Sequence, residues 1–287
     1  MPQPLRFRVG ARTMASVRRN LVRVGLSLDD ALSSDRTALP QLPAAADGYL
    51  ITSLPADQIA ATIADNSQCI ALVRQRYARR YADLSGSFDD YLAGFSSKSR
   101  STLRRKGRKF AKLTDGELDF RAYASRDEMA EFHRVARQLS EKTYQEKLLD
   151  YGLPDDTDFM SDMQRAAAAD QVRGWLLFAD NKPVSYLYAP ADGDTLVYAY
   201  LGYDPDWGRH SPGTVLLLEA LQQLMEEGRF RRFDFTEGDG AQKQRFATGS
   251  LDCADLLLLR PTLTNRLLVG ALAGFDRLVG LAKRVRR

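Results

Sequence analysis

The clearest pattern of apolar and polar positions lies in the middle of the chain. Two apolar runs, residues 172–179 and 184–189, are typical of strands, and the turn-forming residues Asp180 to Pro183 join them. Asp192-Gly193-Asp194 then turns the chain into a third run, Thr195 to Leu201. The pattern predicts a three-stranded meander.

A turn and a helix follow this meander. The third run ends in Gly202-Tyr203-Asp204-Pro205, and the turn Arg209 to Gly213 precedes a helix predicted from Thr214 to Glu227, which Gly228 ends. Downstream we expect three short segments: a strand over 232–235, a polar loop over 236–242 and a strand around 255–259.

Upstream of the meander the apolar spacing is helical. From Ser87 onwards apolar residues recur every three or four positions, at Phe88, Tyr91, Leu92 and Phe95. A basic helix is predicted from Lys98 to about Lys112. Asp127 is expected to cap a further helix, whose apolar face holds Met129, Phe132, Ala136 and Leu139.

The two ends of the chain differ from this middle part. The first 85 residues alternate short apolar runs with a Pro/Ala-rich loop over 38–47, which suggests a partial accessory domain. Near the other end, four apolar residues follow the 4-3-4 spacing of an amphipathic helix: Leu268, Leu272, Phe275 and Val279. We therefore expect an accessory domain over 1–85, a main domain over 86–262 and an amphipathic basic helix over 263–287.

The apolar face of that last helix has two interpretations. It can dock on the core of the protein or on the partner in a homodimer, or it can bind a membrane interface, which the basic residues of 283–287 would favour.

Charge is concentrated in short segments. The chain has 41 Lys and Arg against 37 Asp and Glu, yet Lys98 to Lys112 holds eight basic residues and no acidic one. Two local basic surfaces indicate anionic ligands and argue against a coat for nucleic acid. Within the basic helix one positive stripe is predicted beside the apolar Leu103 and Phe110, and it consists of Arg104, Arg105, Arg108 and Lys112. It could bind the phosphates of a soluble ligand, another anionic molecule or a membrane surface.

Cysteine and histidine are too sparse for a metal centre. Cys69 and Cys253 form no CxxC motif, and His133 and His210 lie far apart in the sequence, so we expect no metal. The first residues contain no apolar run typical of a signal peptide, and no stretch reaches the ~18 apolar residues of a membrane span. We expect a cytoplasmic protein, with peripheral contact to the inner membrane as a further possibility.

The turn before the helix at Thr214 is a candidate anion site. A helix N-terminus offers backbone N–H groups without intrahelical partners, and its dipole favours a negative ligand by roughly 0.3–1 kcal/mol. A glycine at position 213 lets the backbone approach a diphosphate closely. Gly202, Arg209, Ser211, Gly213 and Thr214 are the predicted cofactor-binding residues. An ordinary strand-to-helix connection would show the same pattern.

Four stretches of the chain carry a resemblance to a known family. They are Phe88-Asp-Asp-Tyr91 with residues 96–100 and 103–106; Lys182-Pro183-Val184; Gly202 to Pro205 with Ser211-Pro-Gly213; and Phe233-Asp-Phe235 with Gly238, Asp239, Lys243 and Phe246. In order and spacing they resemble the GNAT-like acyltransferases grouped with cellulose-biosynthesis protein D and the Fem-type peptidoglycan aminoacyl transferases. Two positions depart from the family: Gly213 is the fourth residue after Arg209 instead of the third, and Gln242-Lys243 replaces the frequent Tyr-Lys.

This resemblance implies an α+β fold with a mixed, mostly antiparallel sheet flanked by helices, preceded by a partial GNAT-like domain. It also implies acyl-CoA as cosubstrate, no permanently bound cofactor, and direct attack of an amine on the thioester where the third and fourth strands splay apart. No covalent acyl-enzyme forms in such a reaction.

Several residues match the needs of this chemistry. A carboxylate must take the proton of the amine, and Glu237 is our first candidate, with Asp239 second. Tyr203 could protonate the leaving thiolate, and His210 lies beside the anion-binding turn; packing would equally explain Tyr203. Predicted substrate contacts are Lys243, Arg245, Arg104, Arg105 and Tyr144.

The acceptor can belong to different classes. Aromatic residues of the predicted strands (Trp175, Phe178, Tyr186, Tyr188, Tyr198 and Tyr200) suggest an apolar cleft, which together with the last helix favours a long acyl chain and a sphingoid-type lipid amine, as in bacterial ceramide synthesis. An amino sugar of an exopolysaccharide or peptidoglycan-type precursor is the alternative. A non-catalytic module that binds anionic lipid is a third hypothesis.

Overall fold

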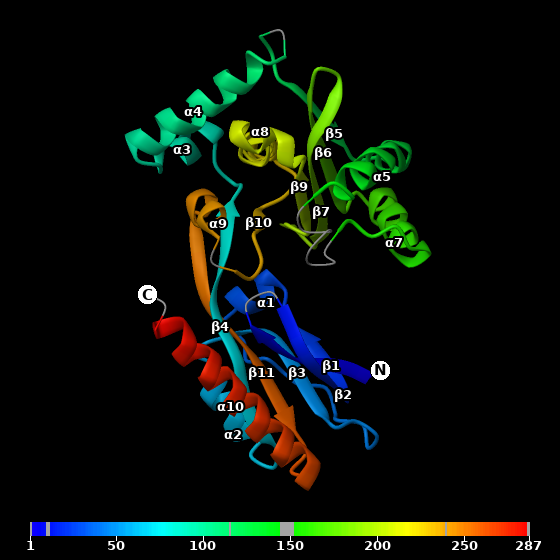
Figure 1. The fold of residues 1–287 in the computed structure, drawn as a ribbon, viewed down its shortest axis with the longest axis vertical. Coiled ribbons are helices and arrows are strands. Elements are labelled where there is room, and N and C mark those ends of the chain that lie inside the picture. The colour runs from blue at the N-terminus through cyan, green and yellow to red at the C-terminus, as the bar shows by residue number, and fades with distance from the viewer. Residues whose placement is uncertain (1, 10–11, 115, 144–151, 239, 286–287) are drawn as a thin grey trace. The chain divides into compact units, whose positions relative to one another are not determined.

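The computed structural model describes residues 2–9, 12–114, 116–143, 152–238 and 240–285, which divide into two compact units (Figure 1). The first unit combines residues 1–79 with 251–287, and the second comprises residues 80–250. Residues 251–262, expected in the main domain, and the last helix both belong to the same unit as the N-terminal segment. That the first unit is a partial GNAT-like domain stays a prediction.

The first unit is built on a sheet in the order β1-β2-β3-β11-β4. Its strands are β1 (Pro2–Val9), β2 (Arg12–Gly25), β3 (Gly48–Pro55), β4 (Ile70–Asp83) and β11 (Gly249–Leu259), and its helices are α1 (Leu28–Leu32), α2 (Ile59–Asp65) and α10 (Leu263–Val285). β2 runs parallel to β3, whereas β1 and β11 pair antiparallel with their neighbours β2 and β3.

Apolar side chains cover both faces of β11. Leu256 and Leu258 pack with Ile51 and with residues of α1 and α2, whereas Leu257 and Leu259 pack with Leu268 and Leu272 of α10. A continuous run of leucines is the pattern of a strand that is buried on both sides. Of the two interpretations of the apolar face of the last helix, the structure shows docking on the core of the protein.

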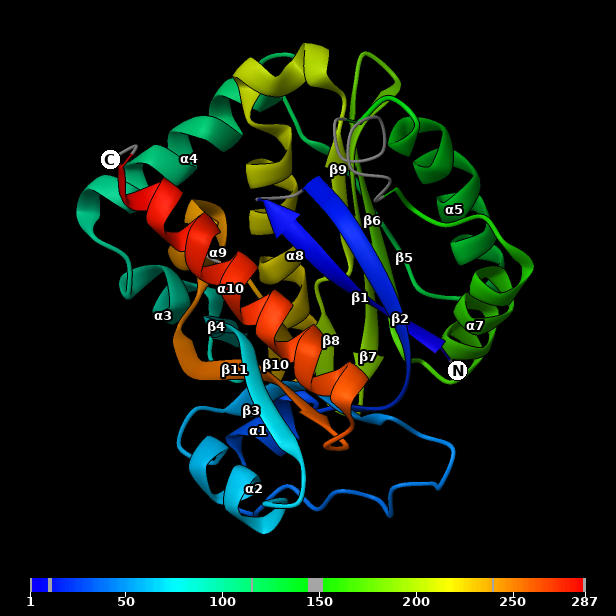
Figure 2. The ribbon, with the colours of Figure 1, turned by 60° about the horizontal axis from the view of Figure 1, so that its bottom comes forward.

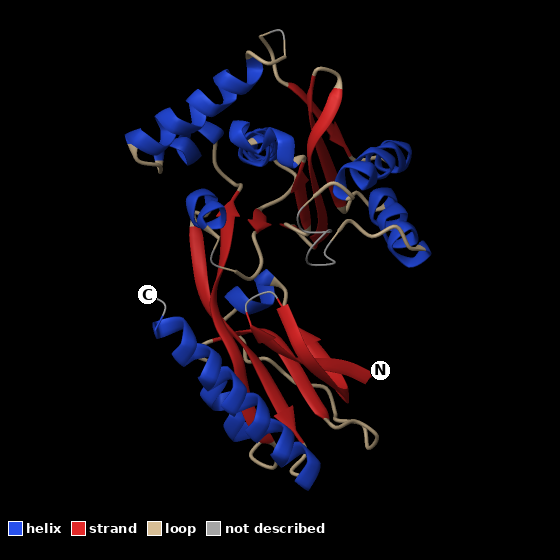
Figure 3. Ribbon diagram, viewed as in Figure 1, coloured by secondary structure: helices blue, strands red, loops and turns tan. Residues whose placement is uncertain are grey.

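The second unit has a sheet in the order β10-β8-β7-β6-β5, with residues 81–83 of β4 paired to the outer side of β10 (Figure 3). Its strands are β5 (Asp119–Tyr123), β6 (Val172–Ala179), β7 (Lys182–Asp192), β8 (Thr195–Val197), β9 (Tyr200–Tyr203) and β10 (Arg232–Asp234). The meander is confirmed, but its third strand is interrupted into β8 and β9.

Helices cover both faces of this sheet. They are α3 (Phe88–Ala93), α4 (Ser97–Ala111), α5 (Arg126–Ser140), α7 (Thr157–Ala168), α8 (Pro212–Glu227) and α9 (Ala241–Phe246), with a 3₁₀ helix, η1, over Pro205–His210. α5 and α7 lie together beside β5–β7 in both views (Figures 1 and 2). Ser125, and not Asp127, caps α5: its hydroxyl accepts the N–H of Glu128, whose carboxylate accepts the N–H of Ser125 in return.

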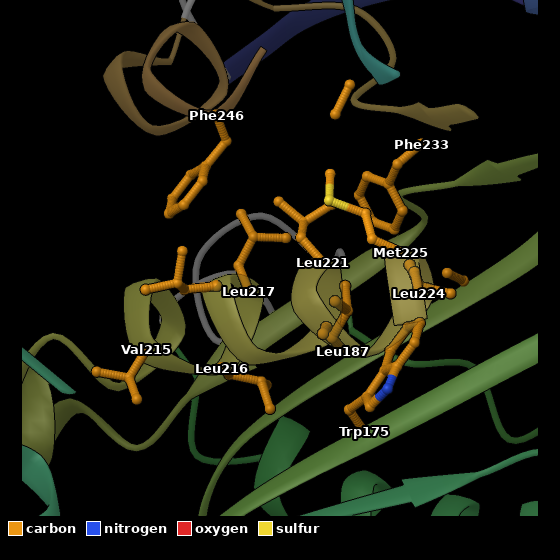
Figure 4. Close-up of a cluster of buried hydrophobic side chains, with 14 of the residues drawn as sticks. Trp175, Leu187, Val215, Leu216, Leu217, Leu221, Leu224, Met225, Phe233 and Phe246 are labelled. Atoms are coloured by element: carbon orange, nitrogen blue, oxygen red, sulfur yellow. The ribbon is translucent and has the colours of Figure 1, made fainter. Parts of the chain in front are cut away.

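α8 is the central helix of the second unit. Its leucines point to two sides: Leu216 faces Leu187 and Trp175 of the sheet, whereas Leu217 faces Phe246 of α9 (Figure 4). A helix that is apolar nearly all round is typical of a buried position. Because α8 is held on both sides, its N-terminus has a fixed place against the sheet, and that end carries the candidate site.

Candidate functional site

Two neighbouring strands separate beside the N-terminus of α8. β8 pairs in parallel with β10 from Thr195 to Val197, and the Tyr198 N–H donates to the Asp234 carbonyl oxygen at 2.8 Å. Beyond this point β9 continues along β7, whereas the chain after β10 turns at Thr236, a residue with a φ of 60°. The resemblance implies that the reaction takes place where the third and fourth strands splay apart. Among the described residues, β9 and β10 diverge in this way.

A lysine holds the turn that follows β10. Lys243 Nζ donates to the carbonyl oxygen of Glu237 at 2.5 Å and to Thr236 Oγ1 at 3.3 Å, and lies 5.5 Å from the Tyr198 ring. Burial lowers the pKa of Lys243, while Asp234 and Glu237 act in the opposite direction. Lys243, predicted to contact the acceptor, therefore positions the turn in which the candidate base lies.

Glu237 is exposed within this turn, between Thr236 and a Gly238 with a φ of 111°. The neighbouring Asp234 is buried, and its Oδ1 accepts the Thr236 N–H at 2.7 Å, so this carboxylate shapes the turn. Of the predicted site residues, Asp239 and Tyr144 lie outside the described residues.

The end of β9 brings a tyrosine and two glycines together. The Asp204 N–H donates to Val184 on β7, so the N–H of Tyr203, one residue earlier, is directed to the opposite edge of the strand, towards the divergence. The Tyr203 ring is 39% exposed and lies 3.6 Å from the point where a Cβ on Gly213 would stand. A donor and a tyrosine hydroxyl group thus lie near the first turn of α8.

Gly202 has a steric reason to be glycine. A Cβ there would stand 2.4 Å from Cε1 of Tyr186 and 2.8 Å from Cγ2 of Thr143. Its carbonyl oxygen accepts the hydroxyl of Ser185 at 2.9 Å. This packing lets β9 approach its neighbours closely, and any contact of Gly202 with a cofactor stays a prediction.

The first turn of α8 is tighter than the sequence suggested. Ser211 adopts a left-handed conformation (φ 56°), and its carbonyl oxygen accepts the N–H groups of both Thr214 and Val215. Pro212 has no N–H and Thr214 has used its own, so Gly213 supplies the donor at the tip of the helix. Gln242 Nε2 donates to the Gly213 carbonyl oxygen at 3.2 Å and ties α9 to this turn.

His210 adds a polar group at the same end of α8. Arg209 Nε donates to His210 Nε2 at 2.9 Å, which places the imidazole proton on Nδ1. Among the described residues Nδ1 is buried and has no hydrogen-bond partner. Burial, and then the charges of Arg209 and Lys109, lower the pKa of His210. An anion bound here would meet two positive charges and an N–H donor.

The four basic residues of the predicted positive stripe of α4 are all exposed, and their role as ligand contacts stays a prediction. Arg104, Arg105, Arg108 and Lys112 are exposed, whereas Leu103 and Phe110 are buried. Phe110 packs against Trp207 of η1, with ring centroids 6.2 Å apart, which brings α4 beside the turn before α8.

Two lysines that the sequence did not single out extend this surface. Lys109 acts on His210, and the pKa of Lys106 is lowered by burial and then by Arg245 and Arg105. Positive groups from α4, η1 and α9 therefore gather near the N-terminus of α8. The spacing of basic residues along α4 was visible in the sequence, but their neighbours from other elements were not.

The predicted aromatic cleft is wrong. Trp175, Phe178, Tyr186 and Tyr188 are all buried in the core, and Trp175 Nε1 donates to Gln223 Oε1 at 2.7 Å. Because helices cover β6 and β7 on both faces, the aromatic side chains on each face of these strands pack in a hydrophobic core. Tyr198 and Tyr200 are half-buried.

In residues 2–285, apart from the gaps given above, no group of three or more His, Cys, Asp or Glu could hold a metal ion. No helix in this part is both long and apolar enough to cross a bilayer.

Comparison with known proteins identifies the family. No curated protein matches the chain. Among solved structures, the C-terminal domain of a protein described as a lysylphosphatidylglycerol synthetase from Agrobacterium fabrum aligns with 79% of this chain and 71% of its own, at 14% identity and a TM-score of 0.53. L-PGS from Bacillus licheniformis (77% and 71% covered, 13% identity, TM-score 0.50) and FemX (75% and 72%, 10%, 0.51) share the same fold.

The family comparison covers the part of the chain that contains the divergence, the turn before α8 and most of α9. Residues 97–244, just over half of the chain, match the family described as Acetyltransferase (GNAT) domain. The chain therefore belongs to the GNAT acetyltransferase family and is an acyltransferase with acyl-CoA as its cosubstrate.

Proposed function

We propose that this enzyme transfers an acyl or aminoacyl group to an amine of a cell-envelope precursor. The observation that carries the proposal is the divergence between β9 and β10, which lies beside the N-terminus of α8. The acceptor class rests on the resemblance to Fem-type transferases and on the fold shared with FemX and with lysylphosphatidylglycerol synthetases.

In this proposal the cosubstrate phosphates lie at the tip of α8. The Gly213 N–H and Arg209 provide donors there, and the stripe of α4 adds positive charge. Several donors that converge on one diphosphate give both affinity and orientation. The thioester would then extend into the divergence.

The reaction needs one bond to form and one to break. The amine nitrogen attacks the thioester carbonyl carbon, the C–S bond breaks, and the thiolate leaves with a proton. In this proposal the Tyr203 N–H donates to the carbonyl oxygen as it gains charge, and one such donor contributes roughly 3–4 kcal/mol. Glu237 takes the proton of the amine, and the Tyr203 hydroxyl supplies the proton of the thiolate.

Two acceptor classes enter the test. The first is a sphingoid-type lipid amine with a long-chain acyl donor, and the second is an amino sugar of an exopolysaccharide or peptidoglycan-type precursor. The buried position of the aromatic residues removes one argument for the lipid amine. The two acceptor classes are therefore distinguished by the rate at which the enzyme acylates each of them. Thioesters from acetyl- to palmitoyl-CoA, each with a sphingoid base or an amino sugar, should show accelerated release of free thiol with one class.

A pair of substitutions tests the role of the turn. Glu237→Gln should lower kcat by about 10²-fold or more, whereas Glu226→Gln, at an exposed position on α8, should leave it unchanged. Full activity of Glu237→Gln would exclude this residue as the base. If no amine accelerates thiol release from any thioester, the proposed function is wrong.

A further inference from the structure

α10 has a second apolar face, opposite to the one that the sequence indicated. Its inner face packs on the sheet through Leu268 and Leu272, and Phe275 meets Phe7 edge to face at 5.4 Å between ring centroids. On the outside, Leu263, Leu267 and Leu278 are 81%, 76% and 68% exposed. At 100° per residue these three leucines lie roughly opposite to Leu272.

This outer face concentrates the exposed apolar surface of the described chain. Five large apolar side chains are well exposed among the described residues, and three of them, Leu263, Leu267 and Leu278, form a line along the outer face of α10. The line continues between the leucines with small exposed residues, at Gly270, Ala271 and Gly274. Scattered exposed leucines need no explanation, but several on one helix face mark an interaction surface.

The charges around the face favour a negative partner. Arg266 and Arg277 are exposed along one border of the line. Asp276, the one acidic residue in the sequence of α10, lies 3.6 Å from the Arg74 guanidinium on the inner side. The first unit as a whole carries 17 basic and 9 acidic residues, whereas the second carries 24 and 28.

We propose that the outer face of α10 binds the surface of an anionic lipid bilayer. The leucines enter the boundary between headgroups and acyl chains, and the arginines contact lipid phosphates, while the inner face stays on the sheet. The helix lies in the plane of the membrane and does not span it. This inference goes beyond the proposed function and does not depend on it.

The experiment measures co-sedimentation of the full chain with vesicles, without any substrate. We expect binding to vesicles of phosphatidylcholine with about 30% phosphatidylglycerol and much weaker binding to phosphatidylcholine alone. The triple variant L263Q/L267Q/L278Q should lower the partition coefficient by about tenfold or more, and R266Q/R277Q should lower it on anionic vesicles only.

A matched control removes two exposed charges elsewhere. R126Q/R134Q on α5 should bind vesicles as the unchanged protein does. Equal binding of the triple variant, or no binding to anionic vesicles, would overturn the proposal. So would a dimer in lipid-free solution, seen by light scattering, that the triple variant abolishes, because the face would then serve a second copy of the chain. Thiol release with a soluble amine tests the enzyme separately.

Discussion

α4 and α10 are both amphipathic helices rich in basic residues, yet they show different outer faces. Both bury large apolar residues on the inside: Phe110 in α4 and Leu272 in α10 are fully buried. The outer stripe of α4 holds only charged side chains, whereas α10 exposes Leu263, Leu267 and Leu278 beside its arginines.

This difference teaches how to separate two kinds of anionic ligand. A strip of charge without apolar surface suits a soluble polyanion such as the phosphates of coenzyme A. Leucines bordered by arginines suit an interface where apolar chains and phosphate groups lie at neighbouring depths. The four predictions below test this comparison.

The largest expected effect concerns the inner faces, which should behave alike. Phe110→Ala and Leu272→Ala should lower the free energy of unfolding by about 3–5 and about 2–5 kcal/mol, because each leaves a cavity in a packed core. Leu267→Ala, on the outer face of α10, should change it by less than about 0.5 kcal/mol. Urea denaturation followed by circular dichroism measures all three. A large loss in Leu267→Ala would mean that its side chain packs within the protein.

Substitutions on the outer face of α4 should affect the use of acyl-CoA and not the binding to vesicles. The charge-reversal variant R104E/R105E/R108E should lower kcat/KM for acyl-CoA by about 100-fold and leave binding to vesicles unchanged, because in the proposed function these exposed arginines attract the cosubstrate phosphates. Initial rates and co-sedimentation provide the two readouts. Unaltered kcat/KM would remove α4 from the cosubstrate site.

Salt should weaken the two interactions to different extents. Raising sodium chloride from about 0.05 to about 0.5 M shortens the screening length, so KM for acyl-CoA should rise severalfold. Vesicle binding should fall less, because burial of the leucines of α10 is not screened. Parallel titrations of both quantities test this prediction, and equal slopes would contradict the different roles of the two faces.

The smallest effect concerns His210, at the junction of α4 and η1. Its pKa lies below the ordinary value of 6.5 in the folded protein, so the unfolded chain binds more protons as the pH falls. Its contribution to stability is therefore complete above about pH 6.5 and is lost as the pH drops through the lowered pKa. His210→Gln should reduce the fall in the free energy of unfolding between about pH 7 and pH 5. If this pH dependence were unchanged in the variant, His210 would not be its cause.

Local patterns predicted the elements of the second unit well. The strand over 172–179 and the helix that Gly228 ends follow from residues close in sequence, and their boundaries agree with the structure to within two residues. The break of the third strand at Tyr198 was not predicted, because it depends on the pairing of β8 with β10, more than thirty residues away.

The conformation of the chain also explains what could not be predicted in the site and at the end of the chain. The amine of Lys243 donates to Thr236 and Glu237, a contact that requires the turn after β10 to fold back on α9, and its role as a substrate contact stays a prediction. The apolar spacing of α10 was correctly assigned to an amphipathic helix. The exposure of Leu263, Leu267 and Leu278 on a second face was not predicted, because spacing alone does not show which apolar residues of a helix the sheet covers.

An interior strand of the first unit follows its neighbours in the sheet at a long distance along the sequence. β11 lies between β3 and β4 in the sheet, but the second unit precedes it along the chain. On the ribosome the second unit can therefore fold before the first has this interior strand, since domains generally fold as units during synthesis. A chain cut short after residue 250 would leave β3 and β4 with unpaired edges, which are templates for aggregation. Synthesis of residues 249–259 is thus the step that closes this sheet.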